Sequence, residues 1–286
     1  MKTRKKKINR KRQTETHRGR AFKLFFFSFV ILFSESLYAQ SNENVFLPAE
    51  KLTYGAFYNL HFIWVNAGEV VFQTDTVTRH DVKRWEFEAT GKSYKAYDFF
   101  YTVRDTFLSR VTYGDFGSDY FIRKVNHAKK STIHQYHFDH VKGKIYSYIQ
   151  RSDGKDFHDT LVLKPTTSDM LSTVYTFRNF NFNRLQKGER VSFSMLVDNK
   201  DEDLYFRYLG KEEVKTRNGR RFLCHKVLIS LLGGDFFPDG EYMNVWFTAD
   251  QNHIPVRVET EILVGSVNAI LTDFENLKYP LTSEIK

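Results

Sequence analysis

The stretch WEFEATG (residues 85–91) determines the type of fold that this sequence predicts. Its apolar residues Trp85, Phe87 and Ala89 alternate with two glutamates. Because successive side chains of a β-strand point to opposite faces, a period of two is typical of a strand with one buried and one solvated face. We therefore expect a sheet with one apolar side and one side facing water.

The same alternation recurs along the chain, with short turn signals between the alternating runs. RVSFSMLVD (190–198) and PVRVETE (255–261) repeat the pattern. Turns are indicated by SDGK (152–155) and by RNGR (217–220), whose Asn-Gly pair favours a two-residue type I′ hairpin. Connections this short join antiparallel neighbours and exclude βαβ units.

One segment, KPTTSDMLSTVYTFRNFNF (164–182), breaks this rhythm. Thr167 or Ser168 is a suitable helix N-cap, which would place Asp169 in the first turn. Apolar side chains then recur on one helical face. We expect one helix over residues 168–180, packed against the sheet.

No Pro-, Gly- or Ser-rich linker divides the chain. We therefore expect a single β-rich domain over residues 46–280, and a two-lobed sheet is the alternative. The segment LLGGDFFPDGEY (231–242) has no helix pattern after its glycines and is interpreted as a loop.

The positive charge is concentrated at the N-terminus. Residues 1–40 contain eleven Lys/Arg and two Glu, while the remaining 246 residues contain 32 basic and 32 acidic side chains. The formal charge of +9 therefore belongs to the first 40 residues, and the formally neutral remainder removes most of the case for a nucleic-acid partner.

The layout of that basic segment predicts a signal peptide over residues 1–39 and an exported protein of the periplasm or cell envelope. An apolar run, LFFFSFVILF (24–33), follows the basic region, and Ala39 offers a cleavage point. The run is too short for a helix to span a hydrocarbon core of ~30 Å, so we expect no transmembrane span in the mature chain. An N-terminal anchor or a basic nucleic-acid arm are the alternatives.

Three segments contain residues suited to catalysis or metal binding, but structural roles explain them better. NVWFTADQNHIPVRVE (244–259) fits a hairpin connection around Asp250 and Asn252. In HQYHFDH (134–140), a strand would spread the three histidines too far for one metal ion. The only cysteine, Cys224, cannot form an internal disulfide and is expected to be a buried thiol.

Recognisable catalytic elements are missing from the sequence as well. It has no G-x-S-x-G elbow, H-E-x-x-H pair or Gly-rich phosphate loop. We expect no enzyme activity, no cofactor and no metal.

Four blocks of the sequence, taken together, resemble the bacterial exported proteins of domain of unknown function 3108. The second block contains a D-x-L-S-x-x-Y-x-x-R pattern at Asp169, Leu171, Ser172, Tyr175 and Arg178. The blocks are 49–73, 166–180, 209–227 and 245–271.

The resemblance implies a mainly β fold: a single curved antiparallel sheet or half-barrel that holds one helix, clam-like as in lipoprotein-localisation carriers. The aromatic content of 16%, the expected signal peptide and the missing catalytic motifs favour an exported noncatalytic protein that binds an apolar or amphipathic ligand, such as a lipid or acyl chain. Candidate ligand-binding residues are Trp64, Tyr175, Arg178 and Trp246. The alternatives are a scaffold that binds an envelope protein partner and, third, a hydrolase.

Overall fold

The computed structural model describes residues 44–60, 62–98, 102–127, 130–230, 242–261 and 265–286. The expected signal peptide lies outside the described residues, as does the expected loop up to residue 241. The domain boundaries expected at 46 and 280 stay a prediction.

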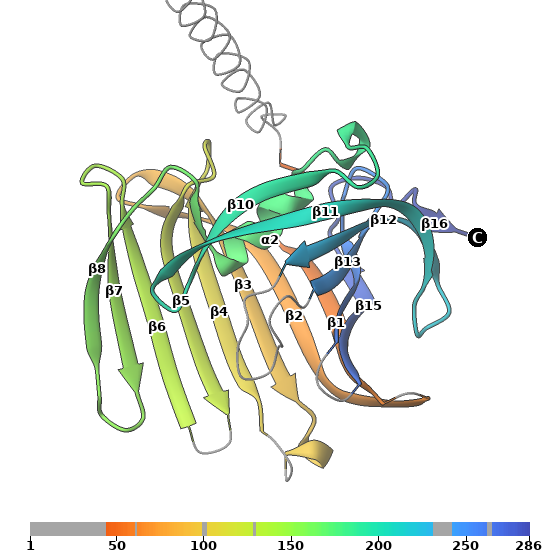
Figure 1. Ribbon diagram of the computed structural model, residues 1–286, viewed down its shortest axis with the longest axis horizontal. Coiled ribbons are helices and arrows are strands. Elements are labelled where there is room, and N and C mark those ends of the chain that lie inside the picture. Colours follow the sequence, from red (N-terminus) through yellow and green to blue (C-terminus); the bar gives the residue numbers. More distant parts are fainter. Residues whose placement is uncertain (1–43, 61, 99–101, 128–129, 231–241, 262–264) are drawn as a thin grey trace, which may run out of the picture. The chain divides into compact units, whose positions relative to one another are not determined.

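The described strands form one sheet of 16 strands (Figure 1). The first half comprises β1 (Glu50–Leu60), β2 (Ile63–Arg79), β3 (Val82–Ser93), β4 (Arg104–Thr112), β5 (Ser118–His127), β6 (Lys130–Asp139), β7 (Lys144–Arg151) and β8 (Phe157–Val162). The second half comprises β9 (Thr167–Asp169), β10 (Arg190–Val197), β11 (Lys200–Lys215), β12 (Arg221–Ser230), β13 (Tyr242–Thr248), β14 (Pro255–Glu261), β15 (Ser266–Glu275) and β16 (Glu284–Ile285). The helical elements are η1 (Lys95–Tyr97), α2 (Met170–Arg178) and η2 (Phe182–Arg184).

The strand order consists of two meanders joined at the centre of the sheet. From one edge it runs β8 to β1, then β15 down to β9, and β16 pairs with β12. The two edge strands, β8 and β9, do not pair with each other, so the sheet stays open. The expectation of one mainly antiparallel sheet with one helix is confirmed, with a single parallel pairing between β9 and β10.

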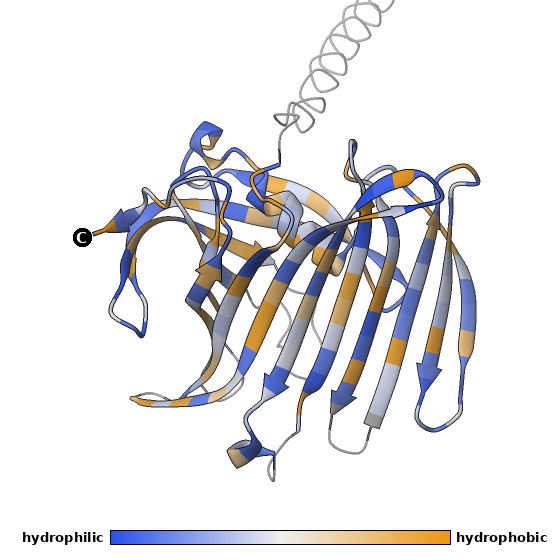
Figure 2. Cartoon of the chain, turned by 180° about the vertical axis from the view of Figure 1, so that it is seen from behind, coloured by the Kyte–Doolittle hydropathy of each residue, from blue (hydrophilic) through white to orange (hydrophobic). Residues whose placement is uncertain are grey.

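The alternation that predicts the fold is visible along the strands (Figure 2). Trp85, Phe87 and Ala89 are all buried on the inner face of β3. They belong to a cluster that also includes Phe121 of β5 and Leu171 of α2. The inner face of the sheet therefore packs against the helix, as the period of two requires.

The helix is shorter than expected, and its cap is a different residue. α2 covers Met170–Arg178, and its N-cap is Asp169 instead of Thr167 or Ser168. The expectation was wrong here because Thr167–Asp169 pairs as β9 with Ser194–Leu196 of β10. A strand partner that is distant in sequence holds these residues extended up to the cap.

The turn chemistry also differs from expectation. The RNGR hairpin has a three-residue loop, because the amide of Thr216 donates to the carbonyl of Arg220. Gly219 (φ +88°) has a positive φ and Asn218 does not, so the type I′ expectation was wrong. The β10–β11 hairpin has two consecutive positive φ angles instead, at Asp198 (47°) and Asn199 (64°), as a type I′ turn requires.

Candidate functional site

A cavity of about 620 Å³ lies between α2 and the inner face of the sheet. Its few polar or charged linings include Thr173, Arg178, Asp198 and Ser230. Pockets of roughly 300–1,000 Å³ with apolar walls and few polar groups are typical of small-molecule sites. Most of the lining is apolar and includes Leu52, Phe72, Val174, Phe177, Met195, Met243, Val245 and Val258.

The opposite side of α2 is filled by side chains. Tyr175 stacks on Phe87 with ring centroids 3.7 Å apart. Phe46 meets the same tyrosine edge-on at 5.2 Å. Aromatic pairs of this kind add to the stability that burial alone provides. The helix therefore separates a packed core over β3–β7 from an apolar cavity beside β1, β2 and β10–β15.

Asp169 fixes the start of the helix. One carboxylate oxygen accepts from the backbone amides of Leu171 and Ser172, both at 2.9 Å. The other accepts from the hydroxyls of Ser109 and Ser118, both at 2.7 Å. Burial raises the pKa of Asp169, and these hydrogen bonds oppose that shift. The residue ties α2 to β4 and β5.

Arg178 fixes the end of the helix. Its guanidinium forms a buried ion pair with Glu50 of β1, with Nη2 3.0 Å from Oε2. Nε and Nη2 also donate to the carbonyl of Asn252, at 3.3 and 3.2 Å. Burial by itself disfavours the charged form, but Glu50 keeps the pKa of Arg178 above its ordinary value. The cation is therefore already neutralised within the protein.

The residues beyond the C-terminal end of α2 are also densely packed. Phe182 stacks on Phe247 at 5.1 Å and on His225 at 5.3 Å. The Nδ1 atom of His225 lies 2.9 Å from the hydroxyl of Tyr208, and Nδ1 of His253 lies 2.7 Å from the carbonyl of Arg178. Burial lowers the pKa of His225 to about 4, so its imidazole is uncharged at pH 7.

Two of the four predicted ligand-binding residues, Tyr175 and Arg178, line the cavity. The hydroxyl of Tyr175 bonds to that of Thr74 at 3.0 Å, and burial raises its pKa. Both side chains thus have partners in the protein already. They can offer a ligand aromatic and aliphatic surface more readily than a free charge.

The other two, Trp64 and Trp246, do not line the cavity. Trp246 lies between Val245 and Phe247, which do line it, so its side chain points to the opposite face. There Arg257 lies over both indoles, 5.9 Å from Trp64 and 5.2 Å from Trp246. The structure therefore places the four candidates in two separate groups.

Sequence reasoning missed the residues that make up most of the cavity wall. Tyr54 on β1, Met195 on β10, Met243 on β13 and Ala269 on β15 are examples. The alternation of apolar and polar residues along each strand predicts that these side chains face inward, and this was the only signal for the cavity in the sequence. Alternation cannot distinguish a residue packed against a neighbour from one that faces a cavity.

The remaining sequence hypotheses concern hairpins and metals. Residues 249–254 connect β13 to β14, and the Asp250 carboxylate accepts from the amide of Asn252 at 3.0 Å, as a turn role predicts. Cys224 is buried, and burial raises the pKa of its thiol. Among the residues that the structure describes, no group of three His, Cys, Asp or Glu side chains could hold a metal ion.

Within the described ranges, no helix combines the length and the apolar character needed to cross a bilayer.

Comparison with known proteins identifies the family. The sequence model described as "Protein of unknown function (DUF3108)" matches residues 57–272. This chain belongs to the DUF3108 family. A search of curated proteins found no match.

A solved structure shares the fold. It is a β-barrel-like protein of domain of unknown function DUF1849 from Brucella abortus, with a TM-score of 0.50 and 9% sequence identity. The match covers 82% of this chain and 100% of the other. At this identity the likeness concerns the fold alone.

The D-x-L-S-x-x-Y-x-x-R block of this DUF3108 chain is buried throughout. Its five residues, Asp169, Leu171, Ser172, Tyr175 and Arg178, are each at most 4% exposed. Asp169 and Arg178 bind the two ends of α2 to the sheet, and Tyr175 packs its middle. In this structure the block positions the helix, and thereby one wall of the cavity.

Proposed function

We propose that this protein is an exported, noncatalytic carrier that binds an apolar or amphipathic ligand, such as a lipid or acyl chain, in the cavity beside α2. The observation that carries the proposal is the 620 Å³ cavity, lined almost entirely by aliphatic and aromatic side chains. Burial of an acyl chain contributes about 0.8 kcal/mol per CH₂ group, so such a wall supports binding without a charged anchor.

The noncatalytic part of the proposal is supported by the polar groups near the cavity. Arg178 is neutralised by Glu50, and Asp169 accepts four hydrogen bonds. A general acid, base or nucleophile must exchange a proton or electron pair with a substrate. Groups that are buried and fully engaged in holding a helix are poorly suited to that task.

The test is lipid uptake by variants that fill the cavity. Ala269→Phe adds a ring to the cavity wall on β15. Val267→Phe is the matched control, because Val267 lies on the same face of the same strand but is 46% exposed and does not line the cavity.

We expect the full chain to bind a fluorescent fatty acid and to co-purify with lipid that mass spectrometry detects. Ala269→Phe should reduce uptake at least tenfold, since it removes space that the ligand needs, while Val267→Phe should leave it within twofold. Equal uptake by both variants, or protein that stays lipid-free after exposure to lipid, would contradict the proposal.

The scaffold alternative has one observation in its favour. β8 forms an edge of the sheet and exposes Phe157 (49%) and Val162 (75%). An open edge with apolar side chains can pair with a strand of another protein. A chain that fails the uptake test while this edge binds an envelope protein would favour that function.

A further inference from the structure

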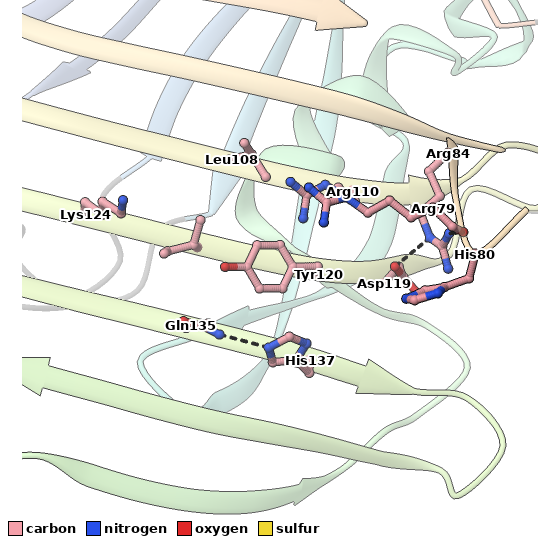
Figure 3. A pocket seen from close by; sticks show the side chains of 11 residues that line it. Arg79, His80, Arg84, Leu108, Arg110, Asp119, Tyr120, Lys124, Gln135 and His137 are labelled. Atoms are coloured by element: carbon pink, nitrogen blue, oxygen red, sulfur yellow. Dashed lines mark hydrogen bonds and ion pairs between the residues drawn. The ribbon is translucent and has the colours of Figure 1, made fainter. Parts of the chain in front are cut away.

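A second hollow, of about 600 Å³, lies on the outer face of the sheet over β3–β6 (Figure 3). Its position follows from strand alternation, because Arg84, Tyr120 and His137 each stand next to a residue buried on the inner face. This hollow is therefore separate from the cavity beside α2. Its polar linings include Arg79, Arg84, Arg110, Lys124, Tyr120 and His137.

The hollow has an excess of positive charge. Two of its four cations are paired: Nε of Arg84 lies 2.7 Å from Asp119, and Nε of Arg110 lies 2.6 Å from Glu86. The other two are Arg79 and Lys124. Neither of their charged groups has a hydrogen bond or ion pair within the part of the chain that the structure describes.

Arg110 is held in a binding orientation. Glu86 fixes its Nε, the ring of Tyr120 lies 5.0 Å from its guanidinium carbon, and only 15% of the side chain is exposed. Its Nη1 and Nη2 atoms make no hydrogen bond with any described residue. A planar guanidinium edge matches the paired oxygens of a phosphate, and a side chain that is already ordered loses little entropy on binding.

A β-bulge shapes the rim of the hollow. Arg110 pairs with Tyr120 and Val111 with Ser118, which leaves Asp119 as the extra residue on β5. The bulge gives the Asp119 side chain contact with Arg84 on the outer face. Bulges commonly re-aim side chains beside binding sites. Next to the bulge, the Tyr120 and His137 rings lie 4.8 Å apart and form an aromatic floor.

We propose that this outer hollow binds a phosphate-bearing ligand. The outer edge of Arg110 holds the phosphate oxygens, and Arg79 and Lys124 attract the negative charge of the ligand from opposite ends of the hollow (Figure 3). The rest of the ligand lies against Tyr120 and His137. A phosphomonoester carries a charge of about −1.5 to −2 and three acceptor oxygens, which suits a free guanidinium edge with an unpaired cation on either side of it. The phosphate can belong to a soluble ester or to a phospholipid headgroup.

The experiment compares two charge-matched double variants of the full chain. Arg79→Ala/Lys124→Ala removes the unpaired cations of the hollow. Lys144→Ala/Lys155→Ala removes two exposed lysines elsewhere on the same domain and lowers the net charge equally. Calorimetry measures binding of glycerol 3-phosphate, and flotation measures binding to phosphatidylcholine vesicles with and without phosphatidylglycerol.

We expect at least one of the two probes to bind the unsubstituted chain and to bind the Arg79/Lys124 variant more weakly. Glycerol 3-phosphate binding that weakens at least tenfold in the Arg79/Lys124 variant, and less than twofold in the control, identifies a soluble ester. The same dependence for phosphatidylglycerol vesicles alone identifies a headgroup. A third variant, Arg110→Lys, keeps the charge but loses the planar edge and should weaken either interaction severalfold.

Three results would overturn the proposal. The first is equal weakening of probe binding in both double variants, because the loss of net charge alone would then explain the effect. The second is failure of the unsubstituted chain to bind either probe saturably. The third is a single-stranded DNA oligonucleotide that binds through the same residues more tightly than the phosphate probes.

Discussion

His225 shows how burial sets the chemistry of a single side chain. It is fully buried, and one ring nitrogen contacts the Tyr208 hydroxyl while the other, Nε2, has no hydrogen-bond partner among the described residues. The sequence showed only that His225 and the adjacent Cys224 would face opposite sides of a strand. It could not show that Phe182, 43 positions earlier, would cover the imidazole.

His225 should make the protein less stable in acid. Burial lowers its pKa to about 4, whereas an unfolded histidine titrates near 6.5. Between pH 4 and 6.5 the unfolded chain therefore binds more protons than the folded chain. The contribution of His225 to stability is therefore complete above pH 6.5 and declines as the pH falls toward 4. Between pH 7.5 and 5 it should lower the free energy of unfolding by about 2 kcal/mol.

Urea unfolding of the full chain at both pH values measures this effect. His225→Gln should remove about 2 kcal/mol of the pH dependence, because glutamine does not titrate. His158→Gln, at an exposed site on β8, should retain it. If the His225→Gln protein keeps the whole pH dependence, the buried imidazole is not its source.

At the scale of elements, α2 depends on its attachments for its stability. A nine-residue helix is marginal on its own, since isolated helices need more than about 12 residues. Asp169 caps it and Arg178 anchors its far end. The sequence predicted the helix from its apolar face and the polar residues before it. It placed the cap too early because the parallel pairing of β9 with β10 leaves no local signal.

Replacing the cap should therefore be costly. Asp169→Ala removes the acceptor for two helix amides and leaves the buried hydroxyls of Ser109 and Ser118 without it. We expect a loss of about 1.5–5 kcal/mol, from a cap worth about 0.5–2 kcal/mol and unsatisfied polar groups worth roughly 1–3 kcal/mol.

Ser168→Ala is the control for the cap, because the Ser168 side chain makes no hydrogen bond with the described residues. It should change stability by less than about 0.5 kcal/mol, as most substitutions away from such features do. Chemical unfolding followed by circular dichroism gives both values. Equal losses in the two variants would rule out Asp169 as the cap that holds α2.

At the scale of the whole molecule, the sequence predicted the sheet but not the cavity. Period-two alternation placed Val245 and Phe247 on one face and Trp246 on the other, as observed. Whether an inward residue meets a neighbour or a cavity depends on how a short helix sits within a wide sheet. Tyr175 packs on Phe87 on one side of α2, whereas Val174 and Phe177 face the cavity on the other side without filling it.

The charge distribution of the whole chain leads to a test of export. Expressed in a Gram-negative host, the chain should be recovered outside the cytoplasm with its N-terminus at Gln40, having lost the segment that carries the net charge of +9. Amino-terminal sequencing and intact mass measure this. A charge in the apolar run, Phe26→Lys, should block cleavage, whereas Lys6→Gln should not. An uncleaved chain in the membrane fraction would favour an N-terminal anchor.

The pairing of β1 with β15 has a consequence for how the protein folds. Tyr54 pairs with Leu271, 217 positions later, at the centre of the sheet. The two meanders cannot join until almost the entire polypeptide has left the ribosome, and closing so long a loop carries a large entropic cost. We therefore expect assembly to be slow and to follow synthesis, which would suit the export proposed for this chain.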